Sequence, residues 1–441
     1  MMNRKIARRK FLKASTAAAA GLTLTSTGLS RDVSESEKSV RVGVVGVGHR
    51  GAALLRVLLS MKGVEVPAIC DIDLQHLQRA MSMVDKTNQK APEGYSNGEE
   101  QAFKSLMDRD DLDAVVIATP WKWHTPMAVY GMRAGKYVGV EVPAAITMEQ
   151  CWELVDAYEE TGVPCMMLEN WSFRRDNLAV LNMIREGLFG EIVHCHCAHS
   201  HDCIDHWFFD EEGNDRWPAK YLLERNADQY PTHSLGPVIS WMDINCGDNF
   251  AQVTSTASKS LGINAYFART FGPEHPGARR QYAQGDIVTT VVKTQRGKTI
   301  VINYDMQLPR PYDNRWMIQG TLGIYNEQRD SIYLSGRSRK FHQWEPFAPY
   351  QAEFEHSWWK TMGNKGRKYG HGGTDYLELD QFLNAVRYKA PTPISVYDSV
   401  IMSVIVPLSE QSIAAGGVPV ECPDFTRGEW KTRKPTFAVE T

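Results

Sequence analysis

The sequence lacks three features that would each assign it to a class of protein. It has no excess of positive charge: the net charge is −3 and no basic stripe is present, which argues against nucleic acid as a partner. No hydrophobic run is long enough to act as a stable membrane anchor. The eight cysteines do not follow the regular spacing of a disulfide-stapled secreted module, so we expect most of them to be buried thiols.

What the chain does have is the composition of a globular protein, 43% hydrophobic and 23% charged. Its 441 residues exceed what one hydrophobic core usually serves, so two domains are expected. Twelve Trp and seventeen Tyr are many for this length. Aromatic faces pack against the C–H surfaces of carbohydrates, although core packing explains most aromatic residues by default.

The most informative segment is VRVGVVGVGHRG (40–51), a β-branched run that leads directly into a helix-like LLRVLLS. It contains Gly46-x-Gly48-x-x-Gly51, whose glycines permit a tight turn, close approach to a pyrophosphate, and close packing of helix on strand. A second apolar run ends at Asp71, where an acidic side chain would meet the adenosine ribose and favour NAD over NADP. The alternative is an ordinary glycine-containing βα turn.

The N-terminal segment indicates export. Residues 1–30 combine Arg8-Arg9-Lys10-Phe11 with a modestly apolar stretch and resemble a Tat signal, which predicts a periplasmic or secreted protein. The Tat route carries folded proteins, so a cofactor can be loaded before export. Residues 31–38 are predicted to be a polar linker. The alternative for this segment is a disordered basic tail.

Strand and helix signals alternate up to about residue 168, which predicts a Rossmann-type doubly wound parallel sheet over 39–170. The expected strands include 113–120, 136–143 and 163–170, and the expected helices include 126–134 and 148–161. Ligands bind at the carboxyl ends of such strands. The candidate contacts there are Trp121 to His124, Glu141, Val142 and Asn170.

From about residue 190 the pattern changes to longer alternating strands with few helical interruptions, which predicts a second, α+β domain over 171–441. We expect a large, mostly antiparallel sheet whose open face forms a floor for substrate. The helical segments 375–386 and 395–415 are expected to pack back across both domains.

Two segments of this second domain could carry chemistry. In HCHCAHSHDC (194–203), alternation along a strand would place Cys195, Cys197, His199 and His201 on one face. That set could bind zinc, but the spacing matches no common zinc pattern, so we favour His199 and His201 facing a substrate cleft and predict no metal site. In Tyr230-Pro231-Thr232-His233, a histidine at a helix start is favoured as the neutral base, with a structural role as the alternative.

The glycine loop, ATPWKWH (118–124) and Glu141-Val142-Pro143 resemble the Gfo/Idh/MocA oxidoreductases. That family usually has Glu-Lys-Pro at the last position, and its lysine shuttles the proton of the substrate hydroxyl. Val142 stands in its place here, and the family's Asp-x-x-x-His pattern falls on His233 and Pro237. Both usual proton carriers are therefore missing, which disfavours ordinary sugar dehydrogenase activity.

A closer resemblance, from about residue 40 to 428, is to glycoside hydrolase family 109, the NAD-dependent α-N-acetylgalactosaminidases. It rests on CMMLEN, RRD, His201-Asp202, YPTHSLGPV, GDIVTT, PRPY (309–312), HQWEP, GHGG, PTPISVYD, PLSEQSI and PDFTRG. The resemblance implies that NAD is held by Gly46, Gly48, His49, Arg50, Gly51, Asp71, Trp121, His124, Glu141, Val142 and Asn170. It implies that the sugar is met by His199, Tyr230, Pro231, Thr232, His233 and Tyr312.

The resemblance also implies a redox route to hydrolysis. Oxidation at C3 of the sugar acidifies the C2 proton, elimination expels the leaving group, water adds, and the hydride returns to C3, so NAD is unchanged overall. Such glycosidases need no pair of catalytic carboxylates. We assign proton transfer to His233, Tyr230 and Tyr312, without ranking them.

Departures from the family pattern bear on the identity of the sugar more than on the mechanism. Phe173 and His199 stand where the family usually has Tyr, and Trp217-Pro218 stands where it has Trp-Arg, a loss for which Arg216 could compensate. Another α- or β-linked hexosaminide, or a different glycoside, therefore stays open. Two alternative functions are an exported sugar oxidoreductase and a non-catalytic carbohydrate-binding protein. The expected partner is a small carbohydrate or terminal hexosaminide, and the sequence leaves a homo-oligomer open.

Overall fold

The structure is a computed structural model that describes residues 39–96, 98 and 100–439. The predicted signal segment 1–30 and linker 31–38 lie outside the described residues. Among the described helices, none has the length and apolar character that crossing a membrane requires.

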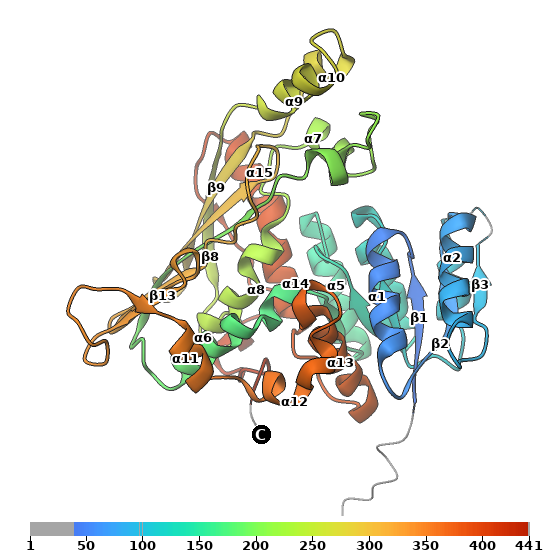
Figure 1. Cartoon of the computed structure of the whole chain (residues 1–441), viewed down its shortest axis with the longest axis horizontal. Coiled ribbons are helices and arrows are strands. Elements are labelled where there is room, and N and C mark those ends of the chain that lie inside the picture. The colour runs from blue at the N-terminus through green and yellow to red at the C-terminus, as the bar shows by residue number, and fades with distance from the viewer. Residues whose placement is uncertain (1–38, 97, 99, 440–441) are drawn as a thin grey trace, which may run out of the picture. The chain divides into compact units, whose positions relative to one another are not determined.

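Six strands of the described residues form a parallel sheet in the order β3-β2-β1-β4-β5-β6 (Figure 1). The strands are β1 Val40–Val45, β2 Val64–Cys70, β3 Glu93–Tyr95, β4 Ala114–Ile117, β5 Tyr137–Val140 and β6 Cys165–Met167. The helices between them are α1 His49–Ser60, α2 Leu74–Asp85, α3 Ala102–Met107, α4 His124–Arg133 and α5 Met148–Thr161. The central strand β4 is apolar and buried along its whole length, and β1 is so apart from Arg41, because both faces of the sheet are covered.

The predicted Rossmann sheet is therefore confirmed, with differences at the element ends. The strand expected over 163–170 stops at Met167, and a 3₁₀ turn, η3 Asn170–Phe173, follows it. The helix expected from residue 126 begins at His124, after the 3₁₀ turn η2 Trp121–Trp123. These short turns bring polar and aromatic side chains to the carboxyl edge of the sheet.

The second sheet contains nine strands in the described residues, ordered β14-β13-β12-β11-β7-β10-β9-β8-β15. Its strands are β7 Ile192–Ser200, β8 Phe250–Ala257, β9 Ile287–Thr294, β10 Thr299–Asp305, β11 Met317–Gly320, β12 Gly323–Asn326, β13 Ser331–Leu334, β14 Glu345–Pro346 and β15 Val420–Glu421. The β7–β10 pair is parallel and the other pairs are antiparallel, which confirms the mostly antiparallel sheet.

The expectation of few helical interruptions after residue 190 is wrong. Several helices join the strands there, namely the π-helical turn η4 Ile204–Phe208, α7 Ala219–Glu224, α8 Pro231–Trp241, α9 Gly262–Thr270 and α10 Pro276–Arg279. Helix α6 Arg175–Arg185 precedes β7, and α11 Ala348–Glu353 and α12 Ser357–Gly366 follow β14. Most of these helices span fewer than ten residues, too short for a clear 3.6-residue period in the sequence.

The C-terminal helices pack against helices of the parallel-sheet half and against the second sheet. Helix α13 Thr374–Tyr388 contacts α1, α14 Val396–Ser403 contacts α5, and α15 Ile405–Ala414 contacts β8 (Figure 1). One buried apolar cluster runs continuously through both halves. The single helix expected over 395–415 is two helices, because Pro407 has no N–H to donate to the Ser403 carbonyl oxygen one turn earlier.

Candidate active site

The loop between β1 and α1 contains three glycines, and the structural reason for a glycine differs among them. Gly46 has a φ of +82°, and a Cβ on it would lie 2.7 Å from the Ala118 carbonyl oxygen. A Cβ on Gly51 would lie 1.8 Å from the Gly46 carbonyl oxygen, so only glycine allows this packing. A Cβ on Gly48 would meet only the His76 ring, at 3.8 Å. The protein itself therefore does not require Gly48, whose missing side chain leaves space outside the loop.

That space is a groove with the properties of an anion site. A cavity of about 400 Å³ is lined by Gly48, His49, Ala52, Ala53, Arg56, His76, Arg79 and Met83. Gly48 gives no side-chain cap to the first turn of α1, so N–H groups at the helix start remain available to a phosphate. The basic lining and the uncapped helix start fit the pyrophosphate of a dinucleotide.

Asp71 lies directly after β2, as the sequence predicted. Its Oδ2 accepts a hydrogen bond from the Val47 backbone N–H at 2.7 Å, and its Oδ1 accepts one from the Asp73 N–H at 2.8 Å. The carboxylate therefore ties the glycine loop to the end of β2. Each oxygen keeps a second lone pair, so a ribose hydroxyl can still donate to it.

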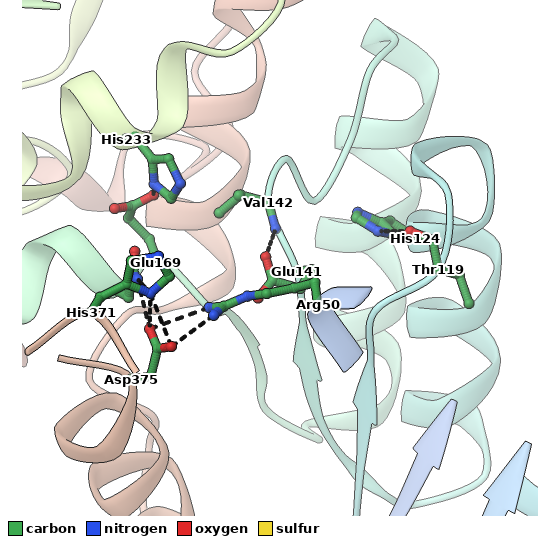
Figure 2. Close-up of polar contacts among 10 residues, drawn as sticks. Arg50, Thr119, His124, Glu141, Val142, Glu169, His233, His371 and Asp375 are labelled. Atoms are coloured by element: carbon green, nitrogen blue, oxygen red, sulfur yellow. Dashed lines mark hydrogen bonds and ion pairs between the residues drawn. The ribbon is translucent and has the colours of Figure 1, made fainter. Parts of the chain in front are cut away.

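Arg50 does not extend into the groove. Its Nε lies 2.5 Å from Glu141 Oε1 and its Nη1 lies 2.7 Å from Asp375 Oδ2 (Figure 2). Glu141 also accepts a hydrogen bond from the Val142 N–H at 3.1 Å. Arg50 thus joins the start of α1 to the ends of β5 and the start of α13, and its guanidinium is committed to two carboxylates.

The His124 side chain forms hydrogen bonds with two loops and is not exposed at the surface. Its Nδ1 lies 2.7 Å from the Pro143 carbonyl oxygen and its Nε2 lies 2.7 Å from that of Thr119, and the ring is buried (Figure 2). His124 thus holds the two loops that follow β4 and β5, and its contact with a cofactor stays a prediction. Val142 is buried and offers no titratable group.

A histidine–carboxylate pair lies at the end of β6. His233, in the first turn of α8, places Nδ1 2.7 Å from Glu169 Oε2 (Figure 2). Glu169 is fully buried, and its other oxygen accepts a hydrogen bond from the Trp171 N–H at 3.0 Å. The bond to Glu169 orients the ring and leaves Nε2 as the nitrogen that can exchange a proton with a ligand.

A second pair joins the loop before α13 to its first turn. His371 Nδ1 lies 3.0 Å from both oxygens of Asp375, and Asn170 Nδ2 donates to Asp375 Oδ1 at 2.7 Å. The Trp171 ring lies between the two histidines, with centroid distances of 6.0 Å to His233 and 5.4 Å to His371. Two imidazoles, each backed by a buried carboxylate, therefore contact the same tryptophan ring.

The electrostatics of the second pair favour a charged carboxylate. Burial alone would raise the pKa of Asp375, but the hydrogen bond from His371 and the charge of Arg50 outweigh burial and hold that pKa well below its usual range. Asp375 is 1% exposed, whereas the His371 side chain is 49% exposed. The pair therefore exposes an imidazole to solvent and keeps its carboxylate inside.

Aromatic and imidazole rings form a wall beside His233. The His199 ring lies 4.9 Å from Tyr230, 5.2 Å from His233 and 5.6 Å from Tyr312, measured between ring centroids. Tyr230 also stacks on Trp121 at 5.8 Å. The structure thus brings together His199, Tyr230, His233 and Tyr312, which the sequence predicted as separate segments.

The pKa shifts of His199, Tyr230 and Tyr312 differ in direction. Burial, followed by the charges of His233 and His201, lowers the pKa of His199 well below its usual value. Burial, followed by the negative charges of Glu141 and Glu169, raises the pKa of Tyr230 well above its usual value. Burial and then Glu169 raise the pKa of Tyr312 in the same way. Both tyrosines are therefore neutral hydrogen-bond donors, and His199 is a neutral imidazole.

Several buried polar atoms at the wall have no hydrogen-bond partner within the described residues. These atoms are His199 Nδ1, Asn170 Oδ1 and Thr232 Oγ1. Unpaired buried polar atoms are costly, and a site for a polar ligand is one explanation for them. Pro231 opens α8 as its first residue and so fixes the start of the helix that carries Thr232 and His233.

Sequence reasoning did not assign three residues of this site: Glu169, His371 and Asp375. Glu169 stands at a strand end beside the predicted Asn170, so the strand-end rule could have included it. His371 and Asp375 lie in GHGGTD, more than 200 residues from β6, and nothing local in that motif indicates that it folds back onto the parallel sheet.

Comparison with known proteins gives two family matches. Residues 173–432 match the model described as the C-terminal domain of glycosyl hydrolase 109. Residues 40–169 match the model of the oxidoreductase family with an NAD-binding Rossmann fold. The matches meet close to the point where the parallel sheet ends.

Two curated relatives match this chain over almost their whole length. An α-N-acetylgalactosaminidase of Tannerella forsythia is 39% identical over 466 residues, covering 98% of this chain and 99% of that protein. A glycosyl hydrolase family 109 protein of Stenotrophomonas maltophilia is 40% identical over 451 residues, covering 98% of each.

Solved structures share the fold at low identity. A levoglucosan dehydrogenase in complex with NADH has a TM-score of 0.67 and 19% identity, over 88% of this chain and 100% of that one. A myo-inositol dehydrogenase from Lactobacillus casei, in complex with NAD(H) and myo-inositol, has a TM-score of 0.60 and 16% identity, over 88% and 97% of the two chains.

The two glycines of the loop give a matched test. We expect Gly51→Ala to destabilise the fold by roughly 2 kcal/mol or more, because its Cβ meets the Gly46 carbonyl oxygen. Gly48→Ala, with open space around its Cβ, should leave stability unchanged and weaken NAD retention instead. Thermal unfolding of NAD-free protein and native mass spectrometry measure the two effects. Equal destabilisation by both variants would contradict this account of the loop.

Proposed function

The chain belongs to glycosyl hydrolase family 109, and on that premise we propose that it is an NAD-dependent glycosidase that hydrolyses α-N-acetylgalactosaminides. The observation that carries the proposal is the meeting of two histidine–carboxylate pairs, His233–Glu169 and His371–Asp375, at the carboxyl edge of a dinucleotide-binding sheet. A sugar dehydrogenase needs one proton shuttle. Cleavage of a glycosidic bond by elimination needs separate groups for the ring and for the leaving oxygen.

The residues present fit NAD. The groove at Gly48 and the uncapped start of α1 would hold the pyrophosphate, and Asp71 would accept from the adenosine ribose. Asn170, whose Oδ1 is buried without a partner among the described residues, is placed to accept from the nicotinamide end. When bound, NAD would supply reversible removal of a hydride from C3 of the sugar while the C3 hydroxyl gives up its proton to a base of the site, and the ketone that results acidifies the proton at C2.

We assign His233 to the ring carbons. Its side chain is only 14% exposed, Glu169 fixes its orientation, and Tyr230 and His199 lie against it. The Nε2 atom, which the bond of Nδ1 to Glu169 leaves available, can take the C2 proton, and the electron pair of that C–H bond then expels the glycosidic oxygen from C1. The negative charge of Glu169 stabilises the imidazolium that results.

We assign His371 to the leaving oxygen. A leaving group of any length must extend toward solvent, and His371 is the half-exposed member of the two histidines. The His371 imidazole, held by its hydrogen bonds to Asp375, can give a proton to the departing oxygen. Burial raises the pKa of Tyr230 and of Tyr312, so we assign both to donate hydrogen bonds to the sugar, and their part in proton transfer stays a prediction.

The roles of Arg50 and His124 follow from their contacts. Arg50 neutralises Glu141 and Asp375 and so holds the loop before α13 against the start of α1. His124 fixes the loops that carry Thr119 and Pro143. Both are positioning residues, and substitutions there are expected to disturb cofactor retention before they change the chemistry.

Export and domain division complete the proposal. The twin arginines Arg8 and Arg9 and the apolar stretch behind them support a Tat-type signal over 1–30 and a periplasmic or secreted enzyme. We further propose that 39–170 binds NAD and 171–441 supplies most of the sugar contacts. The exact aminosugar depends on His199, which stands where the family usually has Tyr.

The first experiment tests hydrolysis with a retained cofactor. Purified full-length protein should cleave an aryl α-N-acetylgalactosaminide and carry one NAD per chain by native mass spectrometry. A 3-deoxy analogue, which has no alcohol to oxidise, should not be cleaved. Cleavage of that analogue at the parent's rate would refute the redox route. Net NADH accumulation with free sugar would instead indicate an oxidoreductase, and sugar affinity without turnover a binding protein.

The second experiment separates the two histidines by leaving group. We expect His371→Asn to lower kcat about 10²–10⁴-fold for a poor alkyl leaving group and much less for a dinitrophenyl one, which needs no proton. His233→Asn should lower both rates by a similar factor, because the C2 proton must leave in either case. His342→Asn, at an exposed position in the loop between β13 and β14, is the control.

NAD content is measured for each variant, so loss of cofactor is not mistaken for loss of chemistry. Equal leaving-group dependence in His371→Asn and His233→Asn would overturn the assignment of separate roles.

A further inference from the structure

A second group of titratable side chains lies outside the two histidine–carboxylate pairs. His201, Cys203 and His206 each offer a ligand atom, and these three atoms lie within 4.8 Å of one another. This set differs from the one considered in the sequence. Cys195 and Cys197 are buried in the core, with each Sγ near a backbone carbonyl oxygen, and they do not take part.

The backbone of the segment is held in place before any ion binds. The His201 N–H donates to the Asp305 carbonyl oxygen at 2.9 Å, and the Cys203 N–H donates to that of Met306 at 3.2 Å. The chain then enters the π-helical turn Ile204–Phe208, whose ends are buried. That turn brings His206 back beside His201, with ring centroids 5.2 Å apart. The convergence is therefore built into the fold at the end of β7.

The orientation of His206 suits a metal ligand. Its Nδ1 lies 3.2 Å from Asp205 Oδ1, which leaves Nε2 as the nitrogen available for coordination. Histidines that bind metals commonly pair their second nitrogen with a carboxylate in this way. The observation is independent of the distances among the three ligand atoms.

The spacing is close to that of a tetrahedral centre. Bonds of about 2.0–2.3 Å from zinc to nitrogen and sulfur place tetrahedral ligands roughly 3.3–3.8 Å apart. Side-chain rotations that move the ligand atoms by about 1 Å would therefore bring the three atoms to bonding distance of one ion. The His201 and His206 rings and the Cys203 sulfur are borderline and soft ligands, which select Zn²⁺ and its analogues over Mg²⁺ or Ca²⁺.

We propose that His201, Cys203 and His206 form a three-ligand site for zinc or a similar divalent transition metal, with the fourth position open to water or ligand. Cys203 is buried and His206 is exposed, so the ion has a path from solvent. Binding converts the Cys203 thiol to a thiolate and releases its proton to solvent.

The position of the site gives it a consequence for the sugar. His201 contacts both the proposed metal site and the aromatic wall. The centroid of its ring lies 4.9 Å from that of Tyr312 and 5.2 Å from that of His206. An ion on His201 would fix that ring and with it one side of the wall formed by His199, Tyr230 and Tyr312. The site would therefore stabilise the outer edge of the sugar pocket.

Cobalt substitution tests the proposal without an activity assay. Untagged full-length protein is treated with a chelator and titrated with Co²⁺. We expect one ion per chain and a thiolate-to-cobalt charge-transfer band in the near ultraviolet. Cys203→Ser should lose that band, and Cys246→Ser, which removes a partly exposed thiol elsewhere, should keep it. Zn²⁺ should displace the cobalt.

A variant at the exposed ligand covers the case in which Cys203→Ser does not fold. His206→Ala should weaken Co²⁺ binding at least tenfold while NAD content and the far-ultraviolet circular dichroism stay unchanged. The proposal is wrong if the unaltered protein binds no stoichiometric Co²⁺. It is equally wrong if a folded Cys203→Ser chain keeps the same spectrum, or if His206→Ala binds Co²⁺ as tightly as the parent.

Discussion

Buried negative charge is the constraint on which this site depends. Glu169 and Asp375 are almost completely removed from water, and an unpaired carboxylate in such a place would cost several kcal/mol. Each is stabilised by a histidine, and Asp375 also by Arg50 and Asn170. The same contacts that make burial tolerable orient two imidazoles against the same tryptophan ring. Stability and proton transfer therefore rest on the same hydrogen bonds.

This arrangement explains how the fold works without the lysine of the related dehydrogenases. Val142 is apolar and buried, so the end of β5 carries no proton there. The proton-carrying groups come instead from α8 and from the loop before α13, both outside the parallel sheet. In the proposed mechanism, the sheet keeps its binding edge for a dinucleotide, and the second half of the chain and its returning helix supply the acid and base. The chemistry that a Rossmann scaffold supports thus depends on which elements of the chain reach the carboxyl edge of its sheet.

The sequence predicted those parts of the molecule that local patterns specify. Alternating strands, the glycine loop and Asp71 gave both sheets correctly, because periodicity and turn chemistry are local. Tyr230 to His233 could be found as a loop entering a helix. The pairing of His371 and Asp375 with Asn170 could not, since it joins residues 201 and 205 positions apart. Short helices such as α7 and α10 also depend on packing that no local pattern records, whereas the break before Pro407 follows from a proline that the prediction of one helix over 395–415 passed over.

The fate of the C2 proton tests the central claim, cleavage by elimination next to a transiently oxidised carbon. The reaction is run in D₂O and the released sugar is examined by NMR and mass spectrometry. The account predicts deuterium at C2 of the product, because the proton taken by the imidazole exchanges with solvent before one is returned. Hydrolysis at the full rate with only hydrogen at C2 would contradict it and indicate direct displacement at C1.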